Sequence, residues 1–151
     1  MLPAHSLAEQ FLIAMPTLLD SVFARTVTLI CQHDEQGAMG LVVNQDSDYT
    51  LGELFDQLDL NCDNAAMRGL AVLSGGPVQA ERGFILHHDG REWDSSMRLS
   101  NGLTVSTSRD ILKALAAGEG PDQFLVLLGY SGWSAGQLEQ ELSENAWLTA
   151  D

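Results

Sequence analysis

The sequence Gly129-Tyr130-Ser131-Gly132-Trp133-Ser134-Ala135-Gly136-Gln137-Leu138 is the stretch around which the chain is organised. The apolar segment 124–128 before it is typical of a buried strand. After it, Leu138 and Leu142 stand four residues apart, which places them on one face of a helix. The glycines of this stretch permit a sharp turn with positive φ. We therefore expect a strand, a glycine-rich turn over 129–133, and a helix.

Composition and charge narrow the class of protein. A chain of 151 residues with 45% hydrophobic content is expected to form one domain, 1–151, with a loose tail over 1–6. Seven Lys and Arg face 21 Asp and Glu, giving a net charge of −14. Such a field repels phosphate backbones and anionic lipid surfaces, and the basic residues are scattered singly. Direct binding to nucleic acid or to a membrane is therefore not expected.

The cysteines and the N-terminal region indicate the compartment. Cys31 and Cys62 lack the spacing of a metal site, and a core of this size does not require a disulfide, which favours a reducing environment. The apolar run 11–15 ends at Pro16 and has no charged segment before it, so it predicts neither a signal peptide nor a membrane span. We expect a cytoplasmic protein.

Periodicity and turn chemistry predict an α+β fold with about seven strands and three helices. Thr50 and Glu53 form a capping box that starts the first helix, and Ile111, Leu112 and Leu115 form the inner face of the second. Hairpins are expected at 34–37 and at 101–102. The expected strands lie at 10–15, 26–33, 38–43, 70–73, 83–87, 97–100, 103–106 and 124–128; the helices lie at about 50–60, from about 108, and after 134–137.

Ser134 has two interpretations. Residues 132–136 satisfy the pattern G-x-S-x-G of a nucleophile elbow, which would indicate a serine hydrolase. That fold places its acid and histidine after the serine, whereas all four histidines precede Ser134. A triad in another order stays open, because geometry defines a triad. We favour Ser134 as the N-cap of the third helix, with Gln137 completing a capping box.

The histidines offer two further hypotheses. Cys31 and His33 stand two apart on a strand and could be nucleophile and base, but a buried cysteine beside a histidine is favoured. His87 and His88 are adjacent, so on a strand they point to opposite faces and do not share a metal ion easily. A metal site built from His33 and one of these two stays open. We otherwise expect no metal and no cofactor.

The remaining glycine cluster, 74–77, could form a nest of N–H groups for an anion, but a structural turn is the favoured interpretation. The chain contains neither a P-loop nor a dinucleotide fingerprint. Tyr130, Trp133 and Trp147 are interpreted as packing residues first and ligand contacts second.

Four motifs in the same order resemble the bacterial YqgE/AlgH family: FLIAMP at 11–16, HDEQGAMGLVVN at 33–44, GGPV at 75–78, and GYSGW with GQLE at 129–139. The resemblance covers nearly the whole chain. It implies a single mixed α/β domain with a bifurcated, partly barrel-like β-sheet flanked by about three helices, and it carries no established catalytic residues. The family is labelled a transcriptional regulator, but the charge of −14 and the lack of a helix-turn-helix signature oppose unaided DNA binding.

Two functions follow as hypotheses. The first is a non-enzymatic binding or regulatory module that recognises an unknown protein or small-molecule ligand through the glycine-rich segments. The alternative is a small hydrolase or metal-dependent enzyme that uses His33, His87 or Ser134. The residues expected to line the binding site are His33, Asn44, Gly75, Gly76, Pro77, Tyr130, Gly132, Trp133 and Gln137.

Overall fold

The computed structural model describes residues 9–15, 25–88, 93, 96–99, 103–107, 109–144 and 146–150, so the expected tail over 1–6 lies outside the described residues. The chain divides into two compact units that alternate along the sequence. The first unit comprises Met1–Gln45, Ser74–Ala80 and Gly129–Asp151, and the second comprises Asp46–Leu73 and Glu81–Leu128. The prediction of a single domain stays a prediction.

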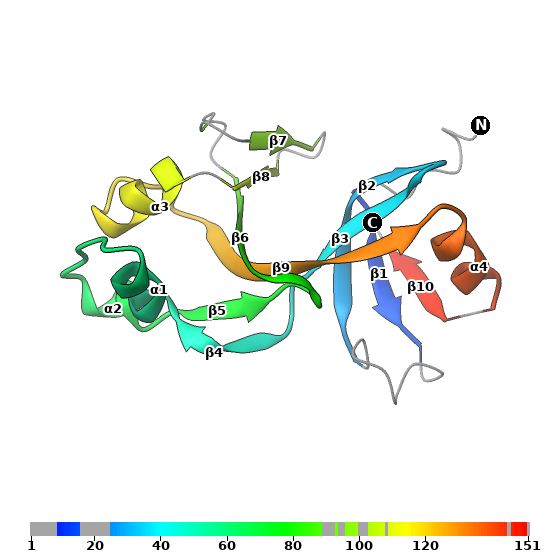
Figure 1. Ribbon diagram of the computed structural model, residues 1–151, viewed down its shortest axis with the longest axis horizontal. Helices are drawn as coiled ribbons and strands as arrows, with labels where there is room; N and C mark the ends of the chain where they lie inside the picture. The colour runs from blue at the N-terminus through cyan, green and yellow to red at the C-terminus, as the bar shows by residue number, and fades with distance from the viewer. Residues whose placement is uncertain are drawn as a thin grey trace. The chain divides into compact units, whose positions relative to one another are not determined.

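Antiparallel strands build the first unit (Figure 1). They follow the order β10 (Trp147–Ala150), β1 (Phe11–Ala14), β2 (Val27–Asp34), β3 (Gly37–Val42) and β9 (Phe124–Ser134), of which residues 129–134 belong to this unit; helix α4 (Gln137–Ser143) follows β9. The predicted hairpin between β2 and β3 is confirmed, with Asp34 paired to Gly37. A β-bulge lies between Ile30 and Gln32 in β2, so Cys31 is the extra residue there.

The core of the first unit is built around two tryptophans. Trp133 and Trp147 pack edge to face with ring centroids 6.0 Å apart, a favourable arrangement for aromatic pairs. Leu12, Ile30 and Leu138 are fully buried in the same cluster. Leu138 therefore faces the core, as predicted from its spacing of four residues from Leu142.

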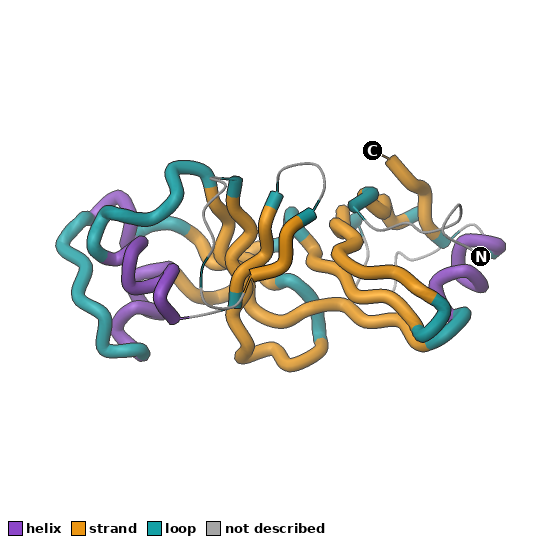
Figure 2. Tube along the Cα trace, turned by 90° about the horizontal axis from the view of Figure 1, so that it is seen from above, coloured by secondary structure: helices purple, strands orange, loops and turns teal. Residues whose placement is uncertain are grey.

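Helices and strands are mixed in the second unit. The helices are α1 (Leu51–Gln57), α2 (Ala65–Arg68) and α3 (Arg109–Ala116), and Figure 2 shows them gathered at one end of the unit's strands. Strand β4 (Asp46–Thr50) pairs with β5 (Ala71–Ser74), while β6 (Val78–His87), β8 (Thr104–Ser106) and β7 (Ser96–Arg98) form a second antiparallel set.

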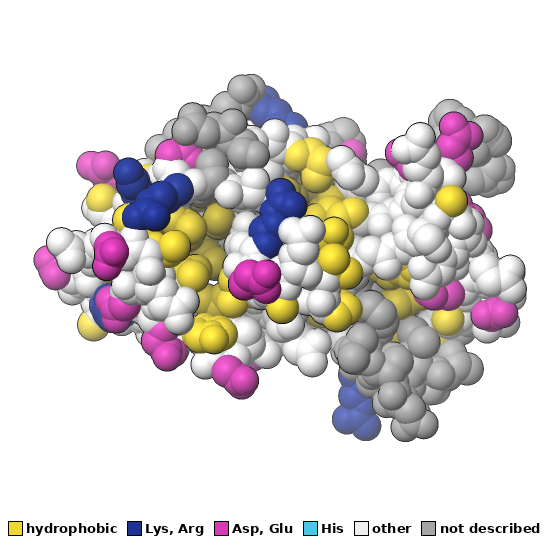
Figure 3. All heavy atoms as spheres, in the orientation of Figure 1, with side chains coloured by type: hydrophobic (Ala, Val, Ile, Leu, Met, Phe, Trp, Pro, Cys, Tyr) yellow, Lys and Arg dark blue, Asp and Glu magenta, His cyan; other side chains and the backbone are white. Residues whose placement is uncertain are grey.

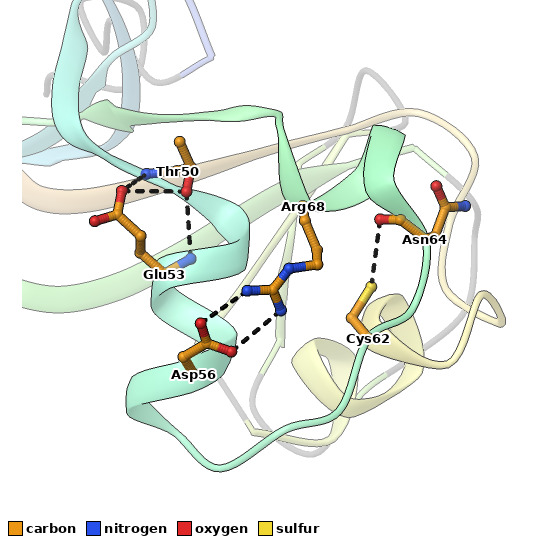
Figure 4. A network of polar contacts seen from close by, with 6 residues as sticks. All are labelled: Thr50, Glu53, Asp56, Cys62, Asn64 and Arg68. Atoms are coloured by element: carbon orange, nitrogen blue, oxygen red, sulfur yellow. Dashed lines mark hydrogen bonds and ion pairs between the residues drawn. The ribbon is translucent and has the colours of Figure 1, made fainter.

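The start of α1 confirms the predicted capping box. The Thr50 hydroxyl accepts a hydrogen bond from the backbone N–H of Glu53, and the Glu53 carboxylate accepts one from the N–H of Thr50 (Figure 4). Arg68 of α2 then forks onto Asp56 of α1, with N···O distances of 3.1 and 2.7 Å. Gly52 permits this approach, because a Cβ there would lie 2.9 Å from Cβ of Arg68.

The core of the second unit confirms the inner face predicted for α3. Ile111, Leu112 and Leu115 are buried against Phe55 of α1, which has no exposed surface. Gly118, which follows α3, has φ +79°, the left-handed conformation that ends helices.

The α+β fold class is confirmed, with two corrections. The described residues contain four helices, and the sequence patterns did not predict α2, β4 or β10. The predicted turn over 129–133 is wrong, because β9 continues to Ser134 and pairs with β3 from Gly40↔Ser131 to Gly37↔Ser134. Pairing with β3 holds residues 131–134 extended, whereas Gly129 has φ +78°.

Candidate functional site

The two glycine-rich segments are packed backbone to backbone in the first unit. A Cβ on Gly76 would overlap the carbonyl group of Tyr130, and one on Gly75 or Gly129 would overlap a carbonyl oxygen of the other segment. The Gly75 carbonyl accepts hydrogen bonds from the Val42 N–H at 2.9 Å and from the Ser131 hydroxyl at 3.3 Å. These contacts support a structural role for both segments.

Asn44 holds the chain at the start of β2. Its side-chain oxygen accepts a hydrogen bond from the N–H of Val27 at 2.8 Å, and its amide donates to the carbonyl of Arg25 at 3.1 Å. Both ends of the amide bond to backbone, which supports a structural role for this predicted site residue as well.

His33 lies against helix α4. Its Nε2 is 3.0 Å from Oε2 of Glu139, and only 4% of its side chain is exposed. A hydrogen bond to the backbone N–H of Glu139 itself and the contact with His33 together lower the pKa of the Glu139 carboxyl. A shallow pocket of about 250 Å³ adjoins this hairpin, with Gln32, Asp34 and Trp133 in its lining.

The Glu141 carboxylate accepts hydrogen bonds from three side chains of the first unit. One carboxylate oxygen, Oε1, accepts the indole N–H of Trp133 at 2.9 Å and that of Trp147 at 2.8 Å. The other oxygen accepts the side-chain amide of Gln137 at 3.0 Å. The structure thus brings Trp133 and Gln137 together through Glu141, a residue that no sequence motif indicated.

The capping role predicted for Ser134 is wrong. The N-cap of α4 is Gly136, with φ 77°, and no side chain caps the helix. Ser134 ends β9, and both its N–H and its hydroxyl donate to Oε1 of Gln137. Because the N-cap of α4 lies two residues after Ser134, Gln137 reaches back as predicted but the serine does not reciprocate.

The Cys31–His33 hypothesis loses its geometric basis at the bulge in β2, which breaks the alternation of faces. Cys31 is 4% exposed, and its thiol donates to the carbonyl of Leu29. Burial raises the pKa of the Cys31 thiol to about 12, so it is not a thiolate at neutral pH. The buried-cysteine interpretation is supported.

His87 is placed differently, in the second unit beside a pocket. The pocket has a volume of about 610 Å³; its apolar lining includes Leu103 and Phe124, and its polar lining includes His87, His88 and Asp122. Among the described residues, no group of three or more His, Cys, Asp and Glu side chains could hold a metal ion.

A chain of hydroxyl groups leads away from His87. Its Nε2 is 2.8 Å from Oγ of Ser106, which is in turn 2.8 Å from Oγ of Ser96. Neither serine was predicted as a site residue: Ser106 ends the strand expected at 103–106, whereas Ser96 lies just before the strand expected at 97–100.

A known protein family matches nearly the whole of this chain. The family model, described as AlgH-like, matches residues 11–151. The chain belongs to the AlgH-like family. The resemblance found in the sequence motifs is thereby confirmed.

Relatives of this AlgH-like chain are close in sequence and in fold. A UPF0301 protein of Stenotrophomonas maltophilia is 58% identical over 144 residues, covering 95% of this chain and 77% of that protein. The solution structure of AlgH from Pseudomonas aeruginosa matches with a TM-score of 0.84 and 48% identity, over 99% of this chain and 79% of that one. The crystal structure of a protein from Corynebacterium diphtheriae shares the fold, with a TM-score of 0.74 and 23% identity over 95% of this chain and 74% of that one.

The charged side chains of this AlgH-like chain are spread over the face drawn in Figure 3. On the face drawn in Figure 3, Asp and Glu side chains are scattered, and Lys and Arg do not gather into a patch. No helix of the described residues is long and apolar enough to span a membrane.

Proposed function

We propose that this protein is a binding module that holds a small amphipathic ligand in the pocket of the second unit. The observation that carries the proposal is the pocket itself, about 610 Å³, whose apolar lining includes Leu103 and Phe124. Pockets of this size with a few polar groups on an apolar floor are where small ligands bind.

The polar lining favours a cationic group on the ligand. Asp122 is exposed at the pocket, and the whole chain carries a net charge of −14. A positive group would therefore be attracted from solution and would meet a carboxylate, while an anion would be repelled. An aromatic or aliphatic ring bearing an ammonium group matches the pocket, with the ring on Phe124 and the ammonium toward Asp122.

The proposal thus keeps the first hypothesis, a binding module, but places the binding site in the pocket of the second unit and not at the glycine-rich segments. The glycine-rich segments support each other's backbone, whereas the pocket offers volume and convergent polar groups. We further infer that a regulatory role would run through this ligand or a protein partner, in the cytoplasm, and not through direct DNA contact; the scattered basic residues and the charge support this inference.

Chemical-shift mapping with phenethylammonium, and with phenylpropionate as an anion of similar size, tests the proposal. We expect the ammonium compound to perturb the amides of His88, Gln123 and Leu125, and the carboxylate to bind more weakly. Asp122→Asn should weaken ammonium binding roughly threefold to fivefold, since an exposed charge pair contributes up to about 1 kcal/mol.

Asp63→Asn is the matched control, because Asp63 is an exposed carboxylate of the same unit outside the pocket. It should leave the affinity unchanged. Perturbations confined to the first unit, or equal binding of the two probes, would contradict the proposed site.

A further inference from the structure

Three side chains of the second unit form a continuous chain of hydrogen bonds from the interior to the surface. His87 is 1% exposed and Ser106 is fully buried, while Ser96 is exposed. The two links, His87 Nε2 to Ser106 Oγ and Ser106 Oγ to Ser96 Oγ, are both 2.8 Å long. An imidazole is therefore connected to the hydroxyl group of an exposed serine through one buried hydroxyl group.

The sheet fixes this arrangement. In the antiparallel register, Ser106 of β8 stands opposite Ile85 of β6 on one side and opposite Ser96 of β7 on the other. His87 is two residues beyond Ile85, so it lies on the same face of β6. All three polar side chains thus come from neighbouring strands, where the pairing holds their separations.

We propose that Ser96 is a reactive nucleophile, acylated by carboxylic esters, with His87 as the base that acts on it through Ser106. The structural alternative is that the three groups only satisfy one another's hydrogen bonds. Because His87 and Ser106 are buried, each needs a hydrogen-bond partner in any case. Burial does not require the chain to end on an exposed hydroxyl, and a nucleophile hydrogen-bonded toward a base is the arrangement that activates a serine.

Acylation of Ser96 involves two proton transfers. With the His87 proton on Nδ1, Ser106 donates to Nε2 and Ser96 donates to Ser106. As Oγ of Ser96 bonds to the ester carbonyl carbon, the proton of Ser96 passes to Ser106 and that of Ser106 passes to Nε2 of His87. The bond from the carbonyl carbon to the leaving alkoxide breaks. His87 returns its proton to Ser106, and the Ser106 hydroxyl gives its own proton directly to the alkoxide, because Oγ of Ser96 is then esterified and carries no proton. Water then hydrolyses the acyl-serine.

The backbone of Trp93 adjusts the nucleophile in two ways. Its N–H donates to Oγ of Ser96 at 3.1 Å, which stabilises negative charge developing on that oxygen. Its carbonyl oxygen, also 3.1 Å away, competes with Ser106 for the single hydroxyl proton. Loss of the Ser106 hydroxyl should therefore leave Ser96 bonded to the Trp93 carbonyl, where no base receives its proton.

A serine-directed fluorophosphonate probe tests the proposal on the full chain. Attack by Ser96 would form an O–P bond and break the P–F bond; fluoride leaves, and the proton passes to His87 and then to solvent. Peptide mapping should place the adduct on Ser96, and Ser96→Ala should remove it. Ser106→Ala should slow labelling about 100-fold, a typical contribution of general base catalysis.

A pH profile separates a base from a structural contact. The labelling rate of the wild type should rise with pH through one titration, and this rise should be absent from Ser106→Ala. His87→Asn should behave like Ser106→Ala; because His87 is buried, melting curves of both variants must first show that they fold. Ser106→Thr, which keeps the hydroxyl, should restore labelling where it folds.

Ser134→Ala is the matched control, since Ser134 is an exposed serine whose hydroxyl donates to Gln137 rather than toward a histidine. It should be labelled like the wild type. An unlabelled wild type, an adduct on another residue, or a folded Ser106→Ala labelled at the wild-type rate would overturn the proposal. This test uses no ammonium ligand, so its result is separate from that of the proposed binding function.

Discussion

Replacement of Gly76 by alanine should be among the most damaging single changes in the first unit. Gly76 has φ +152°, and a Cβ there would overlap the carbonyl carbon and oxygen of Tyr130. The overlap is with backbone, so no side-chain rotation relieves it. Tyr130 is also held in β9, which pairs with β3 from Ser131 onward.

The magnitude follows from two separate costs. An L-residue in a conformation accessible essentially only to glycine costs about 1–3 kcal/mol. Forcing an extra carbon into a closely packed contact costs about 1–3 kcal/mol more. We expect Gly76→Ala to lower the free energy of unfolding by roughly 3–5 kcal/mol, a large part of the stability of a small protein.

Two glycines of the same unit separate these costs. Gly136 has φ +77°, and an added methyl group there would meet nothing within 4 Å, so Gly136→Ala should cost only the conformational part, about 1–2 kcal/mol. Gly132 has an ordinary φ, and a Cβ there would lie 3.7 Å from the Tyr130 ring. Gly132→Ala should therefore be neutral or slightly stabilising.

Denaturant unfolding followed by tryptophan fluorescence measures the series, because Trp133 and Trp147 lie in the core of the first unit. The dependence of free energy on denaturant should keep the same slope in all variants, so that midpoints report stability. If Gly76→Ala unfolded within about 1 kcal/mol of Gly132→Ala, the contact between the two glycine-rich segments would not exist as described.

Ser134→Ala should change stability by less than about 0.5 kcal/mol in thermal melts, as expected for a surface change, whereas a loss of about 1 kcal/mol would restore the capping role. Glu141→Ala removes the acceptor of two indole N–H groups and should cost roughly 2–4 kcal/mol in denaturant unfolding, with a smaller loss for Glu141→Gln, which keeps one oxygen; equal losses would argue against the shared acceptor. Because the pKa of Glu139 is lowered in the folded state, its stabilisation is present above the unfolded value of 4.5 and is lost as pH falls through the folded value, so the difference in stability between wild type and Glu139→Gln should shrink as the pH falls below 4.5; a difference that did not change with pH would contradict the sign. Titration with DNA fragments at ~150 mM salt should show no complex tighter than roughly micromolar, and a salt-sensitive nanomolar complex would refute the inference from charge.

Local patterns in the sequence determined much of the secondary structure. The capping box at Thr50 and Glu53, the hairpin that ends β2, and the buried face of α3 at Ile111, Leu112 and Leu115 were all predicted. Each depends on residues within a few positions of one another, where turn chemistry and periodicity act directly. The polar strand β4 and the four-residue α2 were missed, because neither shows the periodicity of its class.

The candidate sites depended on pairing between distant segments. The sequence cannot show that β3 pairs with residues 131–134 of β9. This pairing turned a predicted turn into a strand, and the N-cap of α4 lies at Gly136. Nor can the sequence show that Glu141 reaches two tryptophans. Local secondary-structure propensity carries no information about which distant segments of the chain come into contact.

The register of the β7–β8 hairpin decided whether Ser96 contacts Ser106. A two-residue turn at 101–102 would pair Met97 with Ser106, whereas the structure pairs Ser96 with Ser106. A shift of one residue moves every side chain of a strand to the opposite face. The sequence alone therefore determined that β7 and β8 form a hairpin and that His87 lies on a strand, while only the tertiary structure decided that Ser96, Ser106 and His87 share one face, because hydrogen bonding across the sheet sets the register.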